Sequence, residues 1–389
     1  MIMIRILSLL LPVLMISGCS WFNSFVRGED NTAPAAELVD IEQSIRIDEV
    51  WDRQASSGIG EDYIKLLPAV EQNRIFVAGN EGDITALAAD TGDIIWEADT
   101  NVPISAGVGL GSDLVLIGSS EGELIALYRN NGQEAWRARV PSEILASPRA
   151  ADGIAIVRSI DGTFTGYDER TGTRLWAYSS TVPALTLRGA APPILAQGAV
   201  ITGLDTGKLL VLSLANGTPV WEKTIAPPRG RTELDRIVDI DAEPRVAGST
   251  LYAATYQGAL TAIDLRNGNT LWSREFSSYT GLDADDTRLY VTDDSDAVWA
   301  LDQRTGGSLW KQTQLSGRRL SAPVVGGGYV VVGDFEGYLH WLNRMDGKIE
   351  ARVRADSEGI VAPPIYHNGI FYILGNSGQL SAYRIASDL

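Results

Sequence analysis

Few side chains in this sequence have the type and spacing that catalysis needs. The two histidines, His340 and His367, lie in separate strand patterns, and neither accompanies a nucleophile motif. No strand-to-helix nucleophile elbow is expected, because helical periodicity is absent from the chain after the signal, and no His-x-x-x-His or Cys-x-x-Cys metal spacing is present. A cluster of aspartates could suggest a calcium site: Asp283, Asp285, Asp286, Asp293, Asp294 and Asp296. The cluster lacks the alternating pattern of a calcium-binding loop and falls on two successive turns. We therefore favour the interpretation that these aspartates are solvated turn residues. The sequence predicts no catalytic residue, cofactor or metal.

Cys19, the single cysteine of the 389-residue chain, has a different chemistry. It follows Ile16-Ser17-Gly18 at the end of a short apolar run that begins after Arg5. This run is too short to cross a bilayer, so residues 1–18 are predicted to be an export signal. The motif is similar to the bacterial lipobox, in which the signal is cleaved before the cysteine and the thiol receives a lipid. We therefore expect a covalent lipid on Cys19.

Residues 19–44 are predicted to be a lipidated tether, because Asn23 to Asp40 shows little periodicity. Ser20 rather than Asp follows the cysteine, which in such lipoproteins implies the outer membrane. The net charge of −17 argues against a nucleic-acid partner, because phosphate binding needs a basic face.

One repeat organises residues 45–389: a Gly, an alternating strand, a turn ending in Gly, and a Trp fourteen positions after the first Gly. Its instances are Gly82 to Trp96, Gly122 to Trp136, Gly162 to Trp176, Gly207 to Trp221 and Gly258 to Trp272. Two more are degraded, since Asp296 replaces the first Gly and Ala351 replaces the Trp. The period of about 40 residues is typical of a four-stranded propeller blade. In the second repeat, strands are expected at 104–108, 114–118, 124–128 and 134–138.

The two ends of the repeat region complement each other. The last unit, which starts at Gly378, lacks its fourth strand, whereas Ile45 to Trp51 is a strand ending in Trp with no unit before it. Pairing them closes the ring and removes exposed sheet edges. The sequence thus predicts an all-β, eight-bladed β-propeller with four-stranded antiparallel blades, closed by an N-terminal strand. The tryptophans are expected to wedge between neighbouring sheets.

Two adjacent interruptions of the repeat indicate where function lies. Most units take 24 to 27 residues from the Trp to the next Gly, but 31 follow Trp176 and 37 follow Trp221. Both extensions join an outer strand to the next inner strand, so they are expected side by side on one face. The first contains Leu185, Leu187 and Arg188, which have the composition of an interface anchor. The alternative is that the leucines cover a local core and Arg188 pairs internally with Asp239 or Asp241.

The repeat, with its Thr-Gly turn and Trp, is similar to the propellers of quinoprotein dehydrogenases. Such enzymes hold their quinone under a vicinal disulfide beside calcium, whereas the sole cysteine here is assigned to lipid. A quinoprotein-like enzyme and a structural repeat without a defined partner remain the alternatives to a binding protein.

Over almost its whole length the chain resembles the BamB family, the lipoprotein subunits of the β-barrel assembly machinery of bacterial outer membranes. The resemblance is carried by residues 185–189 (Leu-Thr-Leu-Arg-Gly), 233–241 (Glu-Leu-Asp-Arg-Ile-Val-Asp-Ile-Asp) and 333–341 (Gly-Asp-Phe-Glu-Gly-Tyr-Leu-His-Trp). It implies a non-catalytic scaffold that faces the periplasm and aids insertion of outer-membrane proteins. It also implies that the two loops bind the periplasmic domains of the barrel subunit BamA. The implied contacts are Leu185, Leu187, Arg188, Asp239 and Asp241. Direct binding of unfolded outer-membrane clients is left open.

Overall fold

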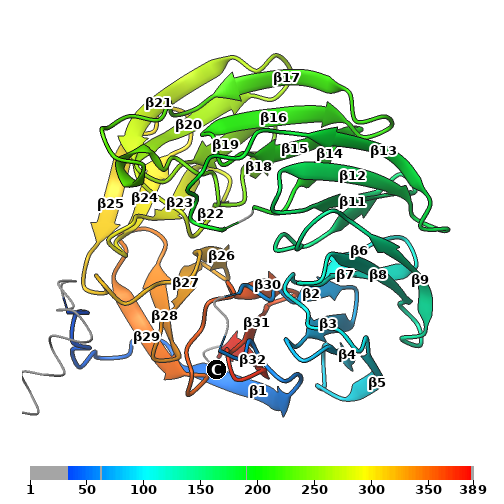
Figure 1. Ribbon diagram of the computed structural model, residues 1–389. Coiled ribbons are helices and arrows are strands. Elements are labelled where there is room, and N and C mark those ends of the chain that lie inside the picture. Colours follow the sequence, from blue (N-terminus) through cyan, green and yellow to red (C-terminus); the bar gives the residue numbers. More distant parts are fainter. Residues whose placement is uncertain (1–33, 62–63, 190, 387–389) are drawn as a thin grey trace, which may run out of the picture. The chain divides into compact units, whose positions relative to one another are not determined.

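The computed structural model describes residues 34–61, 64–189 and 191–386, in a chain divided into the units Met1–Ala35 and Ala36–Leu389. The export signal and Cys19 lie outside the described residues. The second unit contains eight four-stranded antiparallel sheets, which follow one another around a ring (Figure 1). The predicted all-β, eight-bladed propeller is therefore confirmed.

Seven blades place their four strands in chain order from the inside of the ring to the outside, and blade 8 does so for its first three strands and takes β1 as its outer strand. Blade 1 contains β2 (Ala69–Glu71), β3 (Arg74–Ala78), β4 (Asp83–Ala88) and β5 (Ile94–Asp99), and blade 2 contains β6 (Gly109–Leu110), β7 (Leu114–Gly118), β8 (Glu123–Tyr128) and β9 (Glu134–Arg139). Blade 3 contains β10 (Arg149–Ala151), β11 (Ile154–Arg158), β12 (Thr163–Asp168) and β13 (Arg174–Ser179), and blade 4 contains β14 (Ile194–Ala196), β15 (Ala199–Gly203), β16 (Lys208–Ser213) and β17 (Pro219–Thr224).

The remaining blades follow the same order. Blade 5 contains β18 (Arg245–Ala247), β19 (Thr250–Ala254), β20 (Gly258–Asp264) and β21 (Thr270–Phe276), and blade 6 contains β22 (Leu282–Ala284), β23 (Arg288–Thr292), β24 (Val298–Asp302) and β25 (Ser308–Gln312). Blade 7 contains β26 (Val324–Gly326), β27 (Tyr329–Gly333), β28 (Tyr338–Asn343) and β29 (Ile349–Arg354), and blade 8 contains β30 (Ile365–His367), β31 (Ile370–Leu374), β32 (Gln379–Ile385) and β1 (Ile47–Gln54). Among the described residues the one helix is the short 3-10 helix η1 (Leu234–Arg236), and no helix is long and apolar enough to cross a membrane.

The N-terminal strand closes the ring as expected. β1 pairs antiparallel with β32, with Trp51 opposite Ala382, and Figure 1 shows the two ends of the sequence meeting in this one blade. The Trp51 indole Nε1 donates to the Ala89 carbonyl of blade 1 at 3.0 Å. The chain ends therefore share a sheet, and the outer edge of β32 is paired.

The repeated tryptophan and glycine form one joint between neighbouring blades. The Trp96 ring lies against Gly132 of the next blade, and a Cβ atom added at Gly132 would come within 2.6 Å of the ring. The Trp96 Nε1 donates to the Arg129 carbonyl at 2.9 Å. The same joint recurs at Trp51–Gly92, Trp136–Gly172, Trp176–Gly217, Trp221–Gly268, Trp272–Gly306 and Trp310–Gly347. The wedge role of the tryptophans is confirmed, and glycine is required both for its positive φ and for the close approach of the ring.

One strand prediction in blade 2 was wrong. Residues 104–108 alternate like an inner strand, but the inner strand β6 is Gly109–Leu110. Ile104 makes an isolated bridge to Ser119, and the Val108 amide donates to Leu67 O at 2.8 Å. This segment crosses toward blade 1 instead of extending its own sheet.

The predicted tether also differs in part. Residues 36–44 lie against blades 6 and 7, where the Ser44 amide donates to Glu350 O at 3.0 Å. Leu38 and Ile41 pack against the apolar core of these blades. The propeller-associated chain therefore begins at residue 36 rather than 45, because two apolar residues three positions apart suffice to bury one side of this short segment.

Candidate functional site

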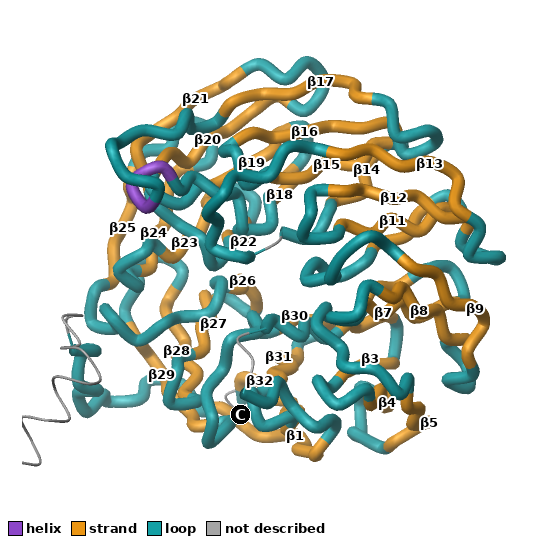
Figure 2. The backbone as a smooth tube through the Cα atoms, viewed as in Figure 1, coloured by secondary structure: helices purple, strands orange, loops and turns teal. Residues whose placement is uncertain are grey.

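The candidate site lies on the face where outer strands connect to the next inner strands. The 3–4 loop (residues 180–193) joins β13 to β14, and the 4–5 loop (residues 225–244) joins β17 to β18 (Figure 2). The Leu187 amide donates to Asp239 Oδ2 at 2.6 Å, which ties one loop to the other. The prediction that the two extensions lie side by side is confirmed.

Close backbone approach strengthens this contact. A Cβ atom at Gly189 would come within 2.4 Å of Asp241 Cγ, so only glycine lets the 3–4 loop pass over this carboxylate. The Asp239 carbonyl in turn accepts from the Tyr256 amide at 2.9 Å, which fixes the 4–5 loop to blade 5. The position of the 3–4 loop therefore depends on the buried side of the 4–5 loop.

Asp239 and Asp241 are both buried, with 0% and 7% of their surfaces exposed. Burial, followed by the negative charge of Asp241, raises the pKa of Asp239 to about 7, while the Leu187 amide opposes the rise. Burial and the charge of Asp205 raise the pKa of Asp241 to about 6. These two predicted site residues do not face solvent, so we expect them to act on loop shape rather than by touching a partner.

Asp205, Asp239 and Asp241 form the one group, among the described residues, of three side chains close enough to share a metal ion. Arg158 pairs with Asp205 at 2.5 Å and donates to the Gly203 carbonyl at 2.9 Å. Lys65 lies in the field of Asp241, whose charge opposes the lowering of the lysine pKa by burial. Because Arg158 and Lys65 offset two of these three carboxylates, and the raised pKa of Asp239 favours its neutral form, we assign no metal to them.

The remaining predicted residues are exposed on the 3–4 loop. Leu185 and Leu187 have 41% and 38% of their surfaces exposed, which is unusual for leucines. The Arg188 side chain is 68% exposed and pairs with Glu143, from the connection between blades 2 and 3. The Arg188 backbone has a left-handed φ of 58°, and its amide donates to Thr186 Oγ1 at 3.1 Å. Glu143 was missed by the sequence, because it lies outside the two extended loops.

The pairing considered as an alternative, Arg188 with Asp239 or Asp241, is not the one observed. Glu143 holds the guanidinium at the surface instead. The loop thus presents two leucines and an arginine. The buried Asp239 carboxylate fixes the loop backbone at Leu187, and this prior ordering of the backbone lowers the entropy cost of binding.

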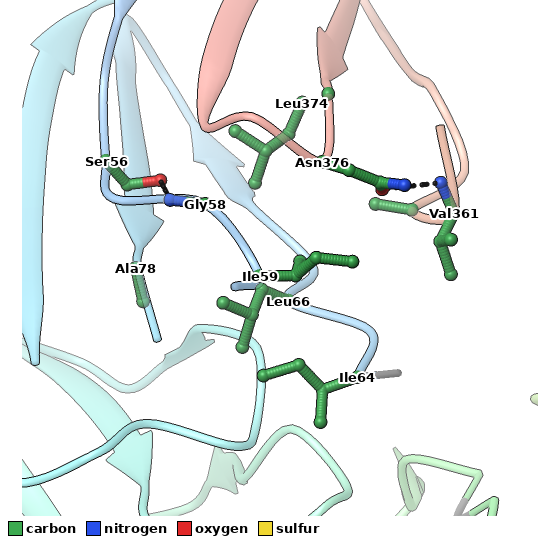
Figure 3. A pocket seen from close by; sticks show the side chains of 11 residues that line it. Ser56, Gly58, Ile59, Ile64, Leu66, Ala78, Val361, Leu374 and Asn376 are labelled. Atoms are coloured by element: carbon green, nitrogen blue, oxygen red, sulfur yellow. Dashed lines mark hydrogen bonds between the residues drawn. The ribbon is translucent and has the colours of Figure 1, made fainter. Parts of the chain in front are cut away.

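Cavities near this face are small. One of about 120 Å³ lies beneath the 3–4 loop, lined by Arg158, Ile160, Thr186, Arg188, Gly189 and Asp205. Another, between blades 8 and 1, is about 10 Å³, and Figure 3 shows Ile59, Ile64 and Leu66 closing it. The second holds at most one water molecule. Neither resembles the 300–1,000 Å³ pockets typical of cofactors.

The histidines serve the fold. His340 is fully buried, and its Nε2 lies 2.9 Å from Asp334 Oδ2. Burial lowers the pKa of His340, which keeps the ring neutral. His367 Nε2 lies 2.9 Å from the Gln72 carbonyl at the joint between blades 8 and 1.

The sequence suggested that the aspartates at 283–296 are solvated turn residues, but several of them make specific hydrogen bonds. Asp293 accepts from Trp299 Nε1 at 2.8 Å, and Asp285 accepts from the Tyr290 hydroxyl at 2.8 Å. Asp296 is buried, accepts the Arg319 and Leu320 amides at 2.8 Å and has a φ of 63°. It therefore replaces the repeat glycine, since aspartate tolerates the left-handed region better than most residues.

The fold and the site define a class of protein: a closed β-propeller whose longest loops form an ordered, partly apolar surface. Residues 80–312 and 298–387 match the family described as outer membrane protein assembly factor BamB. The chain is 44% identical over 378 residues to the outer membrane protein assembly factor BamB of Pseudomonas aeruginosa, covering 97% of this chain and 98% of that one. The crystal structure of BamB from Moraxella catarrhalis superposes with a TM-score of 0.80 at 28% identity, covering 87% of this chain and all of that one.

The chain belongs to the BamB family of outer membrane protein assembly factors. Its members are named for assembly and not for a reaction, in agreement with the expected non-catalytic role. A quinohemoprotein alcohol dehydrogenase from Comamonas testosteroni has a TM-score of 0.71 at 15% identity, covering 88% of this chain and 77% of that one. This likeness concerns the fold alone, so the quinoprotein alternative is not favoured.

Proposed function

We propose that this protein is a lipid-anchored scaffold of the outer-membrane β-barrel assembly complex, which uses the 3–4 loop to bind the periplasmic domains of the barrel subunit BamA. The observation that carries this proposal is the hydrogen bond from the Leu187 amide to Asp239, which holds Leu185, Leu187 and Arg188 outward on one loop. The anchor is the lipid on Cys19, which places the protein at the outer membrane, facing the periplasm.

The chemistry of this surface favours a protein partner. Exposed leucines beside an arginine provide apolar burial together with a directional charge, and arginine is enriched among interface anchors. Because the chain carries a net charge of −17, a locally exposed arginine stands out against an acidic surface. We expect the partner to place a carboxylate opposite Arg188, in competition with Glu143.

Unfolded outer-membrane proteins are a second candidate partner. In several blades the residue before the outer-strand tryptophan is apolar and at least two-fifths exposed: Ile95, Leu175, Val220, Leu271 and Leu309. These residues lie on edge strands with a free side, which can accept an added strand. Contacts with clients would therefore occur around the circumference, away from the BamA-binding loop.

The test is a pull-down of BamA from detergent-solubilised outer membranes with Leu187→Ala and Arg188→Ala variants. We expect each to weaken binding, with a cost of about 2 kcal/mol for an interface anchor, and to melt close to the parent temperature. Ile94→Ala and Arg266→Ala are matched controls, because both residues are exposed but lie outside the two loops. Full-strength binding by both loop variants would refute the site.

A further inference from the structure

The segment before β1 is held by main-chain and side-chain contacts over its whole described length in the second unit. The Ala36 amide donates to Ser316 O at 2.9 Å, and the Ser44 amide donates to Glu350 O on β29 at 3.0 Å. Between these ends, Leu38 and Ile41 pack against the core of blades 6 and 7. We call residues 36–44 the strap. Figure 1 shows it running past β29 into β1.

Two arginines donate hydrogen bonds to backbone carbonyl groups of the strap. Arg318 Nη1 donates to Ala36 O at 3.0 Å, and Arg352 Nη1 donates to Val39 O at 3.0 Å. In the opposite direction, the side-chain amide Nε2 of Gln43 on the strap donates to the Arg352 carbonyl at 3.2 Å. Both ends and the middle of the strap are thus fixed by charge-assisted or backbone hydrogen bonds.

A buried network orients these arginines. Arg318 Nε donates to Asp334 Oδ2 at 2.8 Å, and Arg352 Nε donates to His340 Nδ1 at 3.3 Å. His340 is neutral, so its Nε2 donates to the same Asp334 while its Nδ1 accepts. The network therefore fixes the directions in which both guanidinium groups point.

The joint between blades 7 and 8, which follows the strap, is the one joint among the described blades where no tryptophan docks on a glycine. The outer strand of each other blade docks its Trp on the glycine of the next blade's last turn, but blade 8 has no such turn, because its outer strand β1 comes from the other end of the chain. Blade 7 accordingly carries Ala351 at the Trp position. The strap leads into this joint, where Ile45 and Ile47 pack on the core that contains Trp341.

The strap also starts on a defined face. Ser316 and Arg318 belong to the connection from β25 to β26, which joins an outer strand to the next inner strand. Since all such connections in a ring of antiparallel blades emerge on one face, Ala36 lies on the face that carries the 3–4 and 4–5 loops.

We propose that the strap fixes the start of the anchor segment on the face of the partner-binding loops, so that this face is turned toward the lipid bilayer. The proposal rests on lipidation of Cys19. A chain of the 17 residues from Cys19 to Ala36 spans at most about 60 Å when extended. Without regular structure, a chain of this length has an r.m.s. end-to-end distance of about 23 Å, so residue 36 and the face on which it is fixed are held nearer the membrane than the opposite face.

Orientation is measured with the full-length lipidated protein on phosphatidylethanolamine and phosphatidylglycerol vesicles that carry a fluorescent acceptor on their headgroups. A donor is attached through Glu121→Cys or Asn130→Cys, two exposed sites at opposite ends of blade 2. Residue 121 lies in a turn on the loop face, and residue 130 lies in a turn on the other face. We expect a greater loss of donor emission from position 121. Equal losses, or a greater loss from position 130, would overturn the orientation.

A variant of the strap provides a second test of the proposal. The double substitution Leu38→Asp and Ile41→Asp places charges against the apolar core and should release the strap from the propeller. Release should make the loss of donor emission equal at positions 121 and 130 and should speed protease cleavage within residues 36–44. Val39→Asp is the matched control, because Val39 is 53% exposed. A difference between donors that persists after release would also overturn the strap's role.

Vesicle flotation separates this proposal from the one on which it rests. Protein that does not float with the vesicles would refute the lipid anchor and the proposal together. Protein that floats but shows equal donor losses would refute only the orientation.

Discussion

The most informative single residue is Asp239, since it is buried and yet belongs to the candidate site. Its carboxylate accepts the Leu187 amide, so it shapes the 3–4 loop from below. We therefore expect Asp239→Ala to weaken partner binding by loosening the loop, whereas Asp239→Asn keeps an acceptor oxygen and should retain binding. A pull-down with both variants tests this. Equal losses for the two would show that holding the loop requires the negative charge of Asp239 and not only an acceptor oxygen.

The same residue should make stability depend on pH. Because the folded pKa is raised from 3.8 to about 7, the folded state holds this proton more tightly than the unfolded chain. The contribution of this bound proton to the free energy of unfolding is fully present below pH 4 and is lost as the pH rises to 7. Each pKa unit corresponds to about 1.4 kcal/mol. Urea unfolding at several pH values should show Asp239→Asn to be more stable than the parent above pH 7. A parent-like pH profile would contradict the shift.

Glu143 offers a prediction about Arg188. Since Glu143 pairs with the guanidinium in the free protein, Glu143→Gln removes a competitor of the partner's carboxylate. We expect partner binding to be equal or tighter with this variant, and association to depend more steeply on salt. Arg188→Glu should weaken binding more than Arg188→Ala, because reversal adds repulsion. Weaker binding by Glu143→Gln would mean that the ion pair is needed to position Arg188.

At the scale of elements, β1 is the strand on which closure depends. Deleting Ile45 to Trp51 should expose the edge of β32 and leave Gly92 without the ring that covers it. Loss of a fully buried tryptophan costs about 3–5 kcal/mol, and Trp51, which is partly buried, contributes a share of this in addition to the lost strand pairing. We expect a lower melting temperature and aggregation, measured by circular dichroism and light scattering. An unchanged melting temperature would show that the ring closes in another way.

The sequence was sufficient for the elements that repeat. The Trp and Gly positions determined the number of blades, and the unpaired strand ending at Trp51 predicted the closure. The features that it did not reveal depend on contacts between non-repeated segments. The Glu143–Arg188 pair joins residues 45 positions apart, and the burial of Asp239 and Asp241 depends on the 3–4 loop that covers them. The strap was missed because Leu38 and Ile41 are too few to produce a periodic pattern.

At the scale of the whole molecule, we expect the proposed lipid anchor on Cys19 to decide where the protein works. Cys19→Ser should remove palmitate labelling and leave the propeller intact, because the strap and all eight blades lie beyond residue 35. Radioactive palmitate labelling and a circular dichroism melt check the two parts of this expectation. Binding to the complex can retain some of the variant at the membrane, so labelling is the decisive measurement. Palmitate in the variant would contradict the assignment of Cys19.

The sharing of blade 8 by both chain ends has a consequence for biogenesis. β1 is the first of the described strands to be synthesised, whereas its partner β32 is the last of them. The ring therefore stays open until β32 has been made, and this pairing has the longest loop to close. A chain cut short at any blade keeps an unpaired N-terminal strand and an uncovered Trp51. Such a chain exposes a sheet edge that can pair with other chains.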